Sequence, residues 1–183
     1  MYWIIGIAAV VVLLILWGVS CQRKLVDLDE RCGNALSQIG VQQNSRWDAL
    51  TALAQLTRGY SEHEYKTLMD VIAQRRGIDA HSSAAEADQQ ENMITQALGR
   101  IVAVAEAYPD LKAQATYTKT MDNVKEFENN VRFARMSFND TVTKFNRAVR
   151  QFPTSLIAGM LHFAVRDYLK EDAAKAQMPN MEI

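Results

Sequence analysis

The chain has 183 residues, with 20 Lys or Arg against 21 Asp or Glu, and its formal net charge is −1. This balance excludes a general electrostatic attraction to nucleic acid or to anionic lipid. Its two cysteines, Cys21 and Cys32, form neither a CxxC pair nor a disulfide framework. Prolines and glycines are few and strand-like alternation is absent, so the sequence predicts an all-α protein with one domain large enough for a core.

The first stretch, residues 2–20, is apolar and contains no charged side chain. A hydrocarbon core about 30 Å thick needs about 20 helical residues, and this length occurs here alone in the sequence. Trp3 and Trp17 lie near the two ends, where aromatic rings favour the membrane interface. We therefore expect a transmembrane anchor over residues 1–21.

Two other interpretations of the first stretch would place the rest of the chain across the membrane. One is a cleaved secretory signal, and the other is a lipoprotein signal, since Gly-Val-Ser-Cys at 18–21 loosely resembles a lipobox. Both usually carry a basic n-region, which this sequence lacks. Arg23, Lys24 and Arg31 follow the anchor, so the positive-inside rule predicts a short N-terminus outside and a cytoplasmic domain.

A long helix is predicted over about residues 25–58, continuous with the anchor because residues 22–24 include neither Pro nor Gly. Its apolar face first follows Leu25, Leu28, Cys32, Ala35 and Ile39, and then shifts to Leu36, Gln43, Trp47, Leu50 and Ala54. The patch at 42–48 has two interpretations: a local polar layer or solvated turn, or a surface that contacts another copy. The candidate contacts there are Gln42, Gln43, Arg46 and Trp47.

A turn at residues 59–61 separates this helix from a second one. Ser61 and Glu64 have the S-x-x-E spacing of a capping box, and Gly77 is a suitable stop. The sequence at 78–88 loses helical periodicity and predicts a polar loop.

A third helix is predicted over about 89–108, ending at Pro109, and a last long helix over about 116–151, ending before Pro153. Short connections between helices with apolar stripes predict an antiparallel bundle of about four helices. The expected shape is an elongated rod that stands on the membrane.

An apolar stretch, LIAGMLHF at 156–163, follows the last helix and is too short to span a membrane. It could cap the bundle, lie in the membrane interface or pack against a neighbouring subunit. Its candidate contact residues are Leu156, Ile157, Met160, Leu161 and Phe163. Residues 170–183 are predicted to form a polar C-terminal tail.

No arrangement of residues suggests catalysis. His63, His81 and His162 lack partners at metal-ligand spacing, and no glycine-rich phosphate loop or GxSxG motif occurs. We therefore expect no enzymatic activity, cofactor or metal.

Four blocks of this chain resemble the LemA family of bacterial membrane proteins. They are LVDLDERCGNALSQIGVQ at 25–42, RGYSEHEYKTLMDVIAQR at 58–75, VAVAEAYPDLKA at 102–113 and FNRAVRQFPTSLIAGMLHF at 145–163. The resemblance implies one N-terminal helix in the inner membrane, a cytoplasmic helical bundle over 22–169, and no catalytic residues. Family members usually continue after the VQ with a basic stretch and Ile-Pro, whereas this chain has QNSRWDAL at 43–50.

Two functions fit these expectations. The first is a non-enzymatic scaffold, a homo-oligomer on the bilayer that would bury the 42–48 patch and the 156–163 stretch. The alternative is an adaptor or regulator of a membrane partner; the resemblance suggests a metalloprotease as one example. An exposed apolar patch would serve either function.

Overall fold

The protein is described by a computed structural model over residues 2–170. Within that range all regular structure is helical, which confirms the predicted all-α fold. The helices are α1 (Tyr2–Thr57), α2 (Glu62–Ile72), α3 (Ala84–Ala107), α4 (Pro109–Lys112), α5 (Ala115–Arg150) and α6 (Thr154–Met160).

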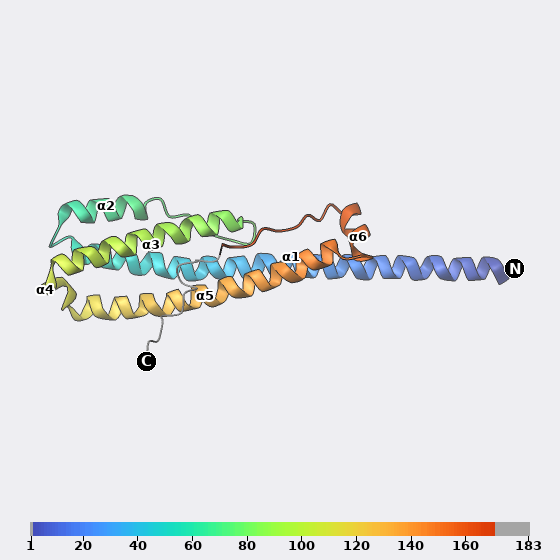
Figure 1. Cartoon of the computed structure of the whole chain (residues 1–183), viewed down its shortest axis with the longest axis horizontal. Helices are drawn as coiled ribbons and strands as arrows, with labels where there is room; N and C mark the ends of the chain where they lie inside the picture. The colour runs from blue at the N-terminus through green and yellow to red at the C-terminus, as the bar shows by residue number, and fades with distance from the viewer. Residues whose placement is uncertain (1, 171–183) are drawn as a thin grey trace, which may run out of the picture.

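The helix α1 runs without interruption from the apolar N-terminal stretch through the whole bundle (Figure 1). Its 56 residues would measure about 84 Å at 1.5 Å per residue, so the predicted continuity of anchor and bundle is confirmed. The first part of α1 extends beyond the other helices and its side chains are exposed. This apolar part is the one segment of residues 2–170 with the length and hydropathy of a membrane span.

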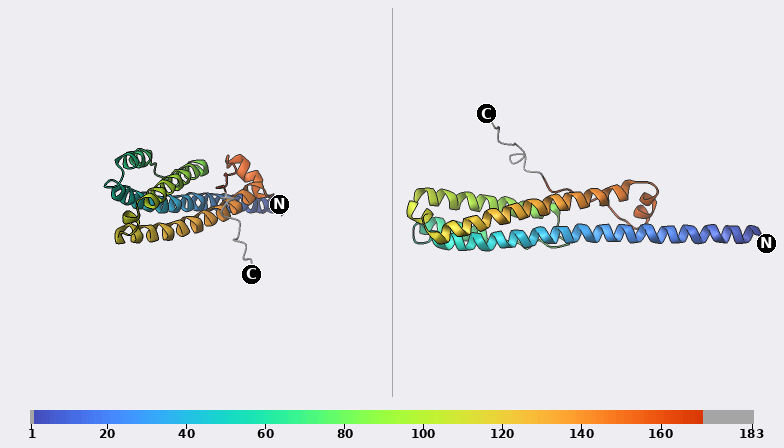
Figure 2. Two further views of the ribbon diagram at one scale, coloured as in Figure 1. Left: turned by 60° about the vertical axis from the view of Figure 1, so that its left-hand side comes forward. Right: turned by 90° about the horizontal axis from the view of Figure 1, so that it is seen from below.

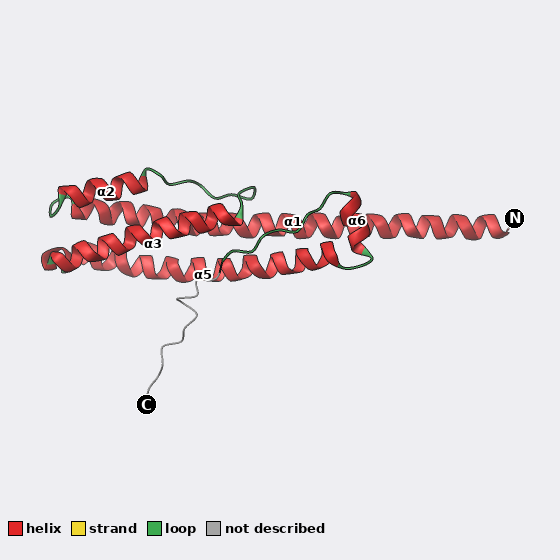
Figure 3. Cartoon of the chain, turned by 45° about the horizontal axis from the view of Figure 1, so that its top comes forward, coloured by secondary structure: helices red, strands yellow, loops and turns green. Residues whose placement is uncertain are grey.

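The helices α2, α3 and α5 pack beside the part of α1 that follows the apolar stretch (Figures 1 and 2). We call the end of the bundle farthest from that stretch distal. The helix α5 runs antiparallel to α1 along most of the bundle, as predicted. The helix α2 and the segment 73–83 run back along α1, so α3 runs parallel to α1, as the first and third helices of an antiparallel bundle do (Figure 3).

The core consists of three clusters arranged along α1. The distal cluster contains Trp47, Leu50, Ile94 and Tyr117, the middle one Cys32, Ile39, Phe138 and Phe145, and the membrane-side one Leu25, Ala148 and Ala158. Both predicted apolar registers of α1 are therefore used, one in each half of the bundle.

The boundaries of α2 and α3 differ from the prediction. The helix α2 ends at Ile72, not at Gly77, and no glycine of the described chain has a positive φ. The helix α3 begins at Ala84, inside the predicted loop, because Ser83 and Glu86 form a reciprocal capping box. These hydrogen bonds from Ser83 also lower the pKa of Glu86.

The segment between α2 and α3 packs closely on α1 at two glycines one heptad apart. A Cβ atom at Gly40 would lie 2.0 Å from the carbonyl oxygen of Ile78, and one at Gly33 would lie 3.2 Å from Ala80 Cβ. The approach at Gly40 leaves no room for a side chain and the one at Gly33 is tight, so the predicted polar loop is in part a packed element that buries Ile78.

The chain after α6 returns along α5 as an extended strap, residues 162–170. The amide of Asn146 accepts from the backbone N–H of Arg166 and donates to its carbonyl, at 2.8 and 2.9 Å. One heptad earlier, Asn139 makes the same pair of bonds with Leu169, at 3.0 and 3.2 Å. The two asparagines thus hold backbone polar groups that no neighbouring strand satisfies. Of the predicted tail, residues 171–183 lie outside the described chain.

Candidate association surfaces

The polar patch of α1 contains a buried layer between α1 and α3. The guanidinium of Arg46 donates to the carboxylate of Glu91, and both residues are buried. Gln43 Nε2 donates to the carbonyl of Ala87 at 2.9 Å and to Glu91 Oε2 at 3.3 Å. Trp47 is fully buried in the adjoining core.

This layer corresponds to the first interpretation of the 42–48 patch, a local polar layer. Gln43, Arg46 and Trp47 were candidate contacts with another copy, but in this structure they face the interior of their own chain and present no surface to a partner. The sequence did not identify Arg46 as a core residue, because its partner Glu91 lies 45 positions later. Gln42, the fourth candidate, is only partly buried and lies on a different face of α1.

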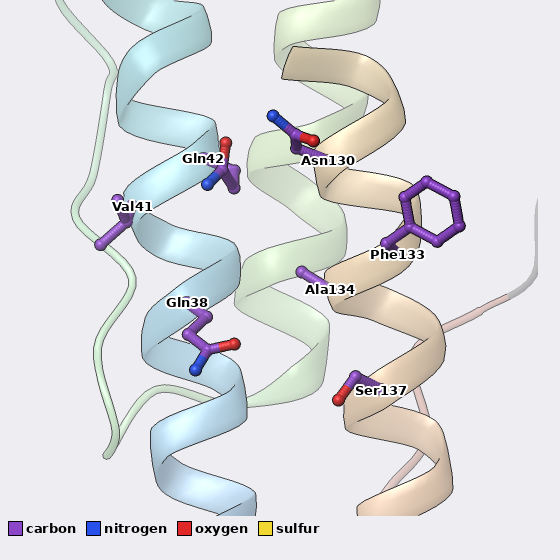
Figure 4. A pocket seen from close by; sticks show the side chains of 7 residues that line it. All are labelled: Gln38, Val41, Gln42, Asn130, Phe133, Ala134 and Ser137. Atoms are coloured by element: carbon purple, nitrogen blue, oxygen red, sulfur yellow. The ribbon is translucent and has the colours of Figure 1, made fainter. Parts of the chain in front are cut away.

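Gln42 lines an open groove of about 550 Å³ between α1 and α5. The groove is formed by Gln38, Val41 and Gln42 from α1 and by Asn130, Phe133, Ala134 and Ser137 from α5. Figure 4 shows Gln38 and Gln42 directed toward the α5 side, with Val41 and Phe133 pointing outward at the two rims. None of these seven side chains is charged, and the guanidinium of Arg132 lies over the rim residue Phe133, 5.5 Å from the centre of its ring.

The rims of this groove are apolar and exposed. Val41 and Phe133 are each 60% exposed, and Met136 beside Phe133 is 58% exposed. Amide and hydroxyl groups between apolar rims can both donate and accept hydrogen bonds. The arrangement can therefore bind a helix or loop that offers uncharged polar groups and apolar side chains.

The predicted contact residues at 156–163 lie in and after α6, and they separate into two groups. Ile157 and Phe163 are partly buried against the membrane-side cluster, and Phe163 meets the ring of Phe145 edge-on at 6.2 Å. Leu156, Met160 and Leu161 are exposed. The stretch therefore caps the membrane-side end of the bundle with one face and leaves its other face uncovered.

The three histidines of the chain lie in separate places and do not form a shared site. His63, His81 and His162 are exposed and lie in α2, in the loop before α3 and after α6. Within residues 2–170 no three His, Cys, Asp or Glu side chains are placed to hold a metal ion.

The sequence is similar to known proteins. The magnetosome proteins MamQ 1 and MamQ 2 of Paramagnetospirillum magneticum and MamQ of Magnetospirillum gryphiswaldense are each 30% identical to this chain over 78 residues. The match covers 43% of this chain but only 29% of each relative, so the chain spans less than a third of their length. The sequence signature of the LemA family matches residues 35–183, which include α2 to α6 and residues 35–57 of α1. With its apolar first stretch ahead of that match, this chain is a membrane-associated member of the LemA family.

Proposed function

We propose that this protein is a non-enzymatic scaffold, anchored in the bacterial inner membrane by α1, whose copies associate side by side through the α1–α5 groove. The bundle lies in the cytoplasm and the N-terminus lies outside. The observation that carries the proposal is the groove itself, because it combines exposed apolar rims with an uncharged polar lining.

The lining suits contact between identical copies. A two-fold interface places the same patch against itself, so charged groups of one sign would repel each other. Gln38, Gln42 and Asn130 avoid this cost, because each amide offers a donor and an acceptor to its counterpart. The apolar rims then contribute burial around the hydrogen bonds.

The anchor favours the same contact. All copies with one membrane orientation present their grooves at the same height above the bilayer, since α1 is continuous from the span into the groove. Confinement to a membrane also raises the effective concentration of the copies.

The test is the mass of the full-length protein extracted in detergent, measured by light scattering for the wild type and for Phe133→Glu. We expect a discrete multi-subunit particle for the wild type. The variant should associate at least about tenfold more weakly, because the contact would lose an apolar ring and would have to remove a carboxylate from water.

The matched control is Val102→Glu, which changes an exposed apolar residue of α3 that does not line the groove. It should leave the mass of the particle unchanged. A monomeric wild type would contradict the scaffold. A monomer that gains mass only with a membrane partner would support the adaptor function instead.

A further inference from the structure

The end of the bundle nearest the apolar stretch of α1 carries a second uncovered apolar surface. Residues 151–165 contain no Asp, Glu, Lys or Arg. The exposed fractions are 75% for Phe152, 58% for Leu156, 75% for Met160 and 42% for Leu161. We call these four side chains the α6 patch.

The position of α6 along α1 is fixed by contacts. A Cβ atom at Gly18 would lie 3.9 Å from Ile157 Cδ1, so Ile157 packs on the last turn of the apolar stretch that ends at Ser20. Ala158 is buried with Leu25 of α1 and Ala148 of α5. If residues 2–20 cross the bilayer, α6 lies within about one helical turn, ~5 Å, of the place where α1 leaves the hydrocarbon.

The orientation of α6 is that of a helix in a membrane surface. Figures 1 and 3 show α6 lying across α1, whereas α5 lies along it. A helix that lies across a membrane-spanning helix is close to the plane of the bilayer. Interfacial helices have this orientation, with the apolar face in the boundary between headgroups and acyl chains.

Four basic residues lie on the parts of α1 and α5 that adjoin α6. Arg23 and Lys24 follow the span on α1, and Arg147 and Arg150 are in the last turn of α5. All four are exposed, and no ion pair found within residues 2–170 includes them. Each such charge near an anionic membrane surface contributes about 1 kcal/mol of attraction.

We propose that the α6 patch inserts into the leaflet that α1 leaves, with Arg147 and Arg150 over anionic lipid headgroups. The protein then has two membrane contacts, the span and the α6 patch. The strap fixes α6 to the bundle through Asn146 and Arg166, so both contacts together hold the bundle at a set angle to the bilayer. This inference requires α1 to span the membrane and does not depend on self-association.

The test uses the full-length protein with Cys21→Ser, Cys32→Ser and Met160→Cys, labelled with an environment-sensitive fluorophore. It is reconstituted in vesicles of phosphatidylcholine and phosphatidylglycerol in equal amounts. Lipids that carry a quencher near the headgroup should lower the emission by about twofold or more, because an interfacial helix buries its apolar face about 5–10 Å deep. Aqueous iodide should have little effect.

The matched control is Phe133→Cys in the same background, an exposed apolar position of α5 about 25 Å from Arg150 at 1.5 Å per residue. It should respond little to the lipid quencher, whatever covers the groove. A second site, Leu156→Cys, should behave like Met160→Cys. Replacing Arg147 and Arg150 by Glu should reduce lipid quenching at Met160→Cys in the anionic vesicles.

Two results would overturn the inference. Strong iodide quenching at Met160→Cys would show that the patch faces water. Protection from iodide without lipid quenching would show that another protein chain covers it. Light scattering on the same labelled samples reports self-association separately, so failure of the scaffold and failure of the lipid contact give different results.

Discussion

Arg46 and Glu91 form a buried ion pair in the distal half of the bundle. They join α1 to α3 across a layer where Gln43 also donates to Glu91. Within the described chain no hydrogen-bond partner reaches Arg46 Nε, Gln43 Oε1 or Trp47 Nε1. The charge of Arg46 is therefore balanced mainly by Glu91, and few other hydrogen bonds would replace this pair if it were broken.

Glu91→Gln should destabilise the protein by about 3–5 kcal/mol, because it leaves the Arg46 charge buried without a counter-ion. The measurement is urea unfolding of the full-length protein in detergent, followed by far-UV circular dichroism. The paired change Arg46→Met with Glu91→Leu should cost far less than Glu91→Gln, since both charges leave together.

The control for this prediction is Asp48→Asn. Asp48 binds Arg75 at 2.7 Å on the surface, and its side chain is 71% exposed, so the change should cost less than about 1 kcal/mol. Equal losses for Glu91→Gln and Asp48→Asn would contradict the assignment of a buried pair.

Cys32 should react slowly in the native protein. Burial raises the pKa of the Cys32 thiol, the Arg166 guanidinium opposes the rise, and the Asp29 carboxylate adds to it. The reactive form is the thiolate, and a raised pKa leaves less of it at pH 8. In a Cys21→Ser background, alkylation by iodoacetamide should be at least about tenfold slower in buffer than in urea. Equal rates would show that this part of α1 is not packed.

At the scale of elements, the contact between α1 and the segment 73–83 is closest at Gly40. Gly40→Ala should destabilise the protein by about 1–3 kcal/mol or more, because its Cβ would overlap the carbonyl of Ile78. The free energy of unfolding in urea measures the loss.

Gly99→Ala is the matched control, since it lies inside α3 with no atom within 4 Å of the added Cβ. It should stabilise the helix by about 0.5–1 kcal/mol, because alanine is the better helix former. A neutral Gly40→Ala would show that the segment can move away from α1.

Much of the element order is predictable because helix signals are local. The continuity of α1 follows from the absence of Pro and Gly at residues 22–24. The length of α5 follows from its helical periodicity, which ends before Pro153. The start of α3 was missed although its signal, Ser83 with Glu86, is in the sequence. The strap could not be predicted, because Asn139 and Asn146 act only when Leu169 and Arg166 lie beside them.

The whole molecule is a long helical rod (Figure 1). The orientation of α1 in the membrane determines in which compartment the groove lies. With Arg23, Lys24 and Arg31 after the span, we expect Tyr2 on the outer side of the inner membrane and the distal tip at Asp110 in the cytoplasm. In a background without the native cysteines, an impermeant maleimide should label Tyr2→Cys in intact cells. It should label Asp110→Cys only after lysis.

Labelling of Asp110→Cys in intact cells would contradict this topology. It would favour one of the two other interpretations of the first stretch, a cleaved secretory signal or a lipoprotein signal. The same outcome would move both the groove and the α6 patch to the other side of the membrane. The contacts within the chain would not change.

The sequence by itself determined what depends on neighbouring residues: the apolar span, the helical periodicity, most helix ends and the family blocks. Hydropathy and period are properties of short windows, so they can be read without knowing what a helix packs against. Only the tertiary structure decided which polar residues are inside and where α6 lies. Those outcomes depend on partners far along the chain, as Glu91 is for Arg46 and Gly18 is for Ile157. The burial of a charge and the height of an apolar patch above a membrane are properties of such pairs, and neither residue alone encodes them.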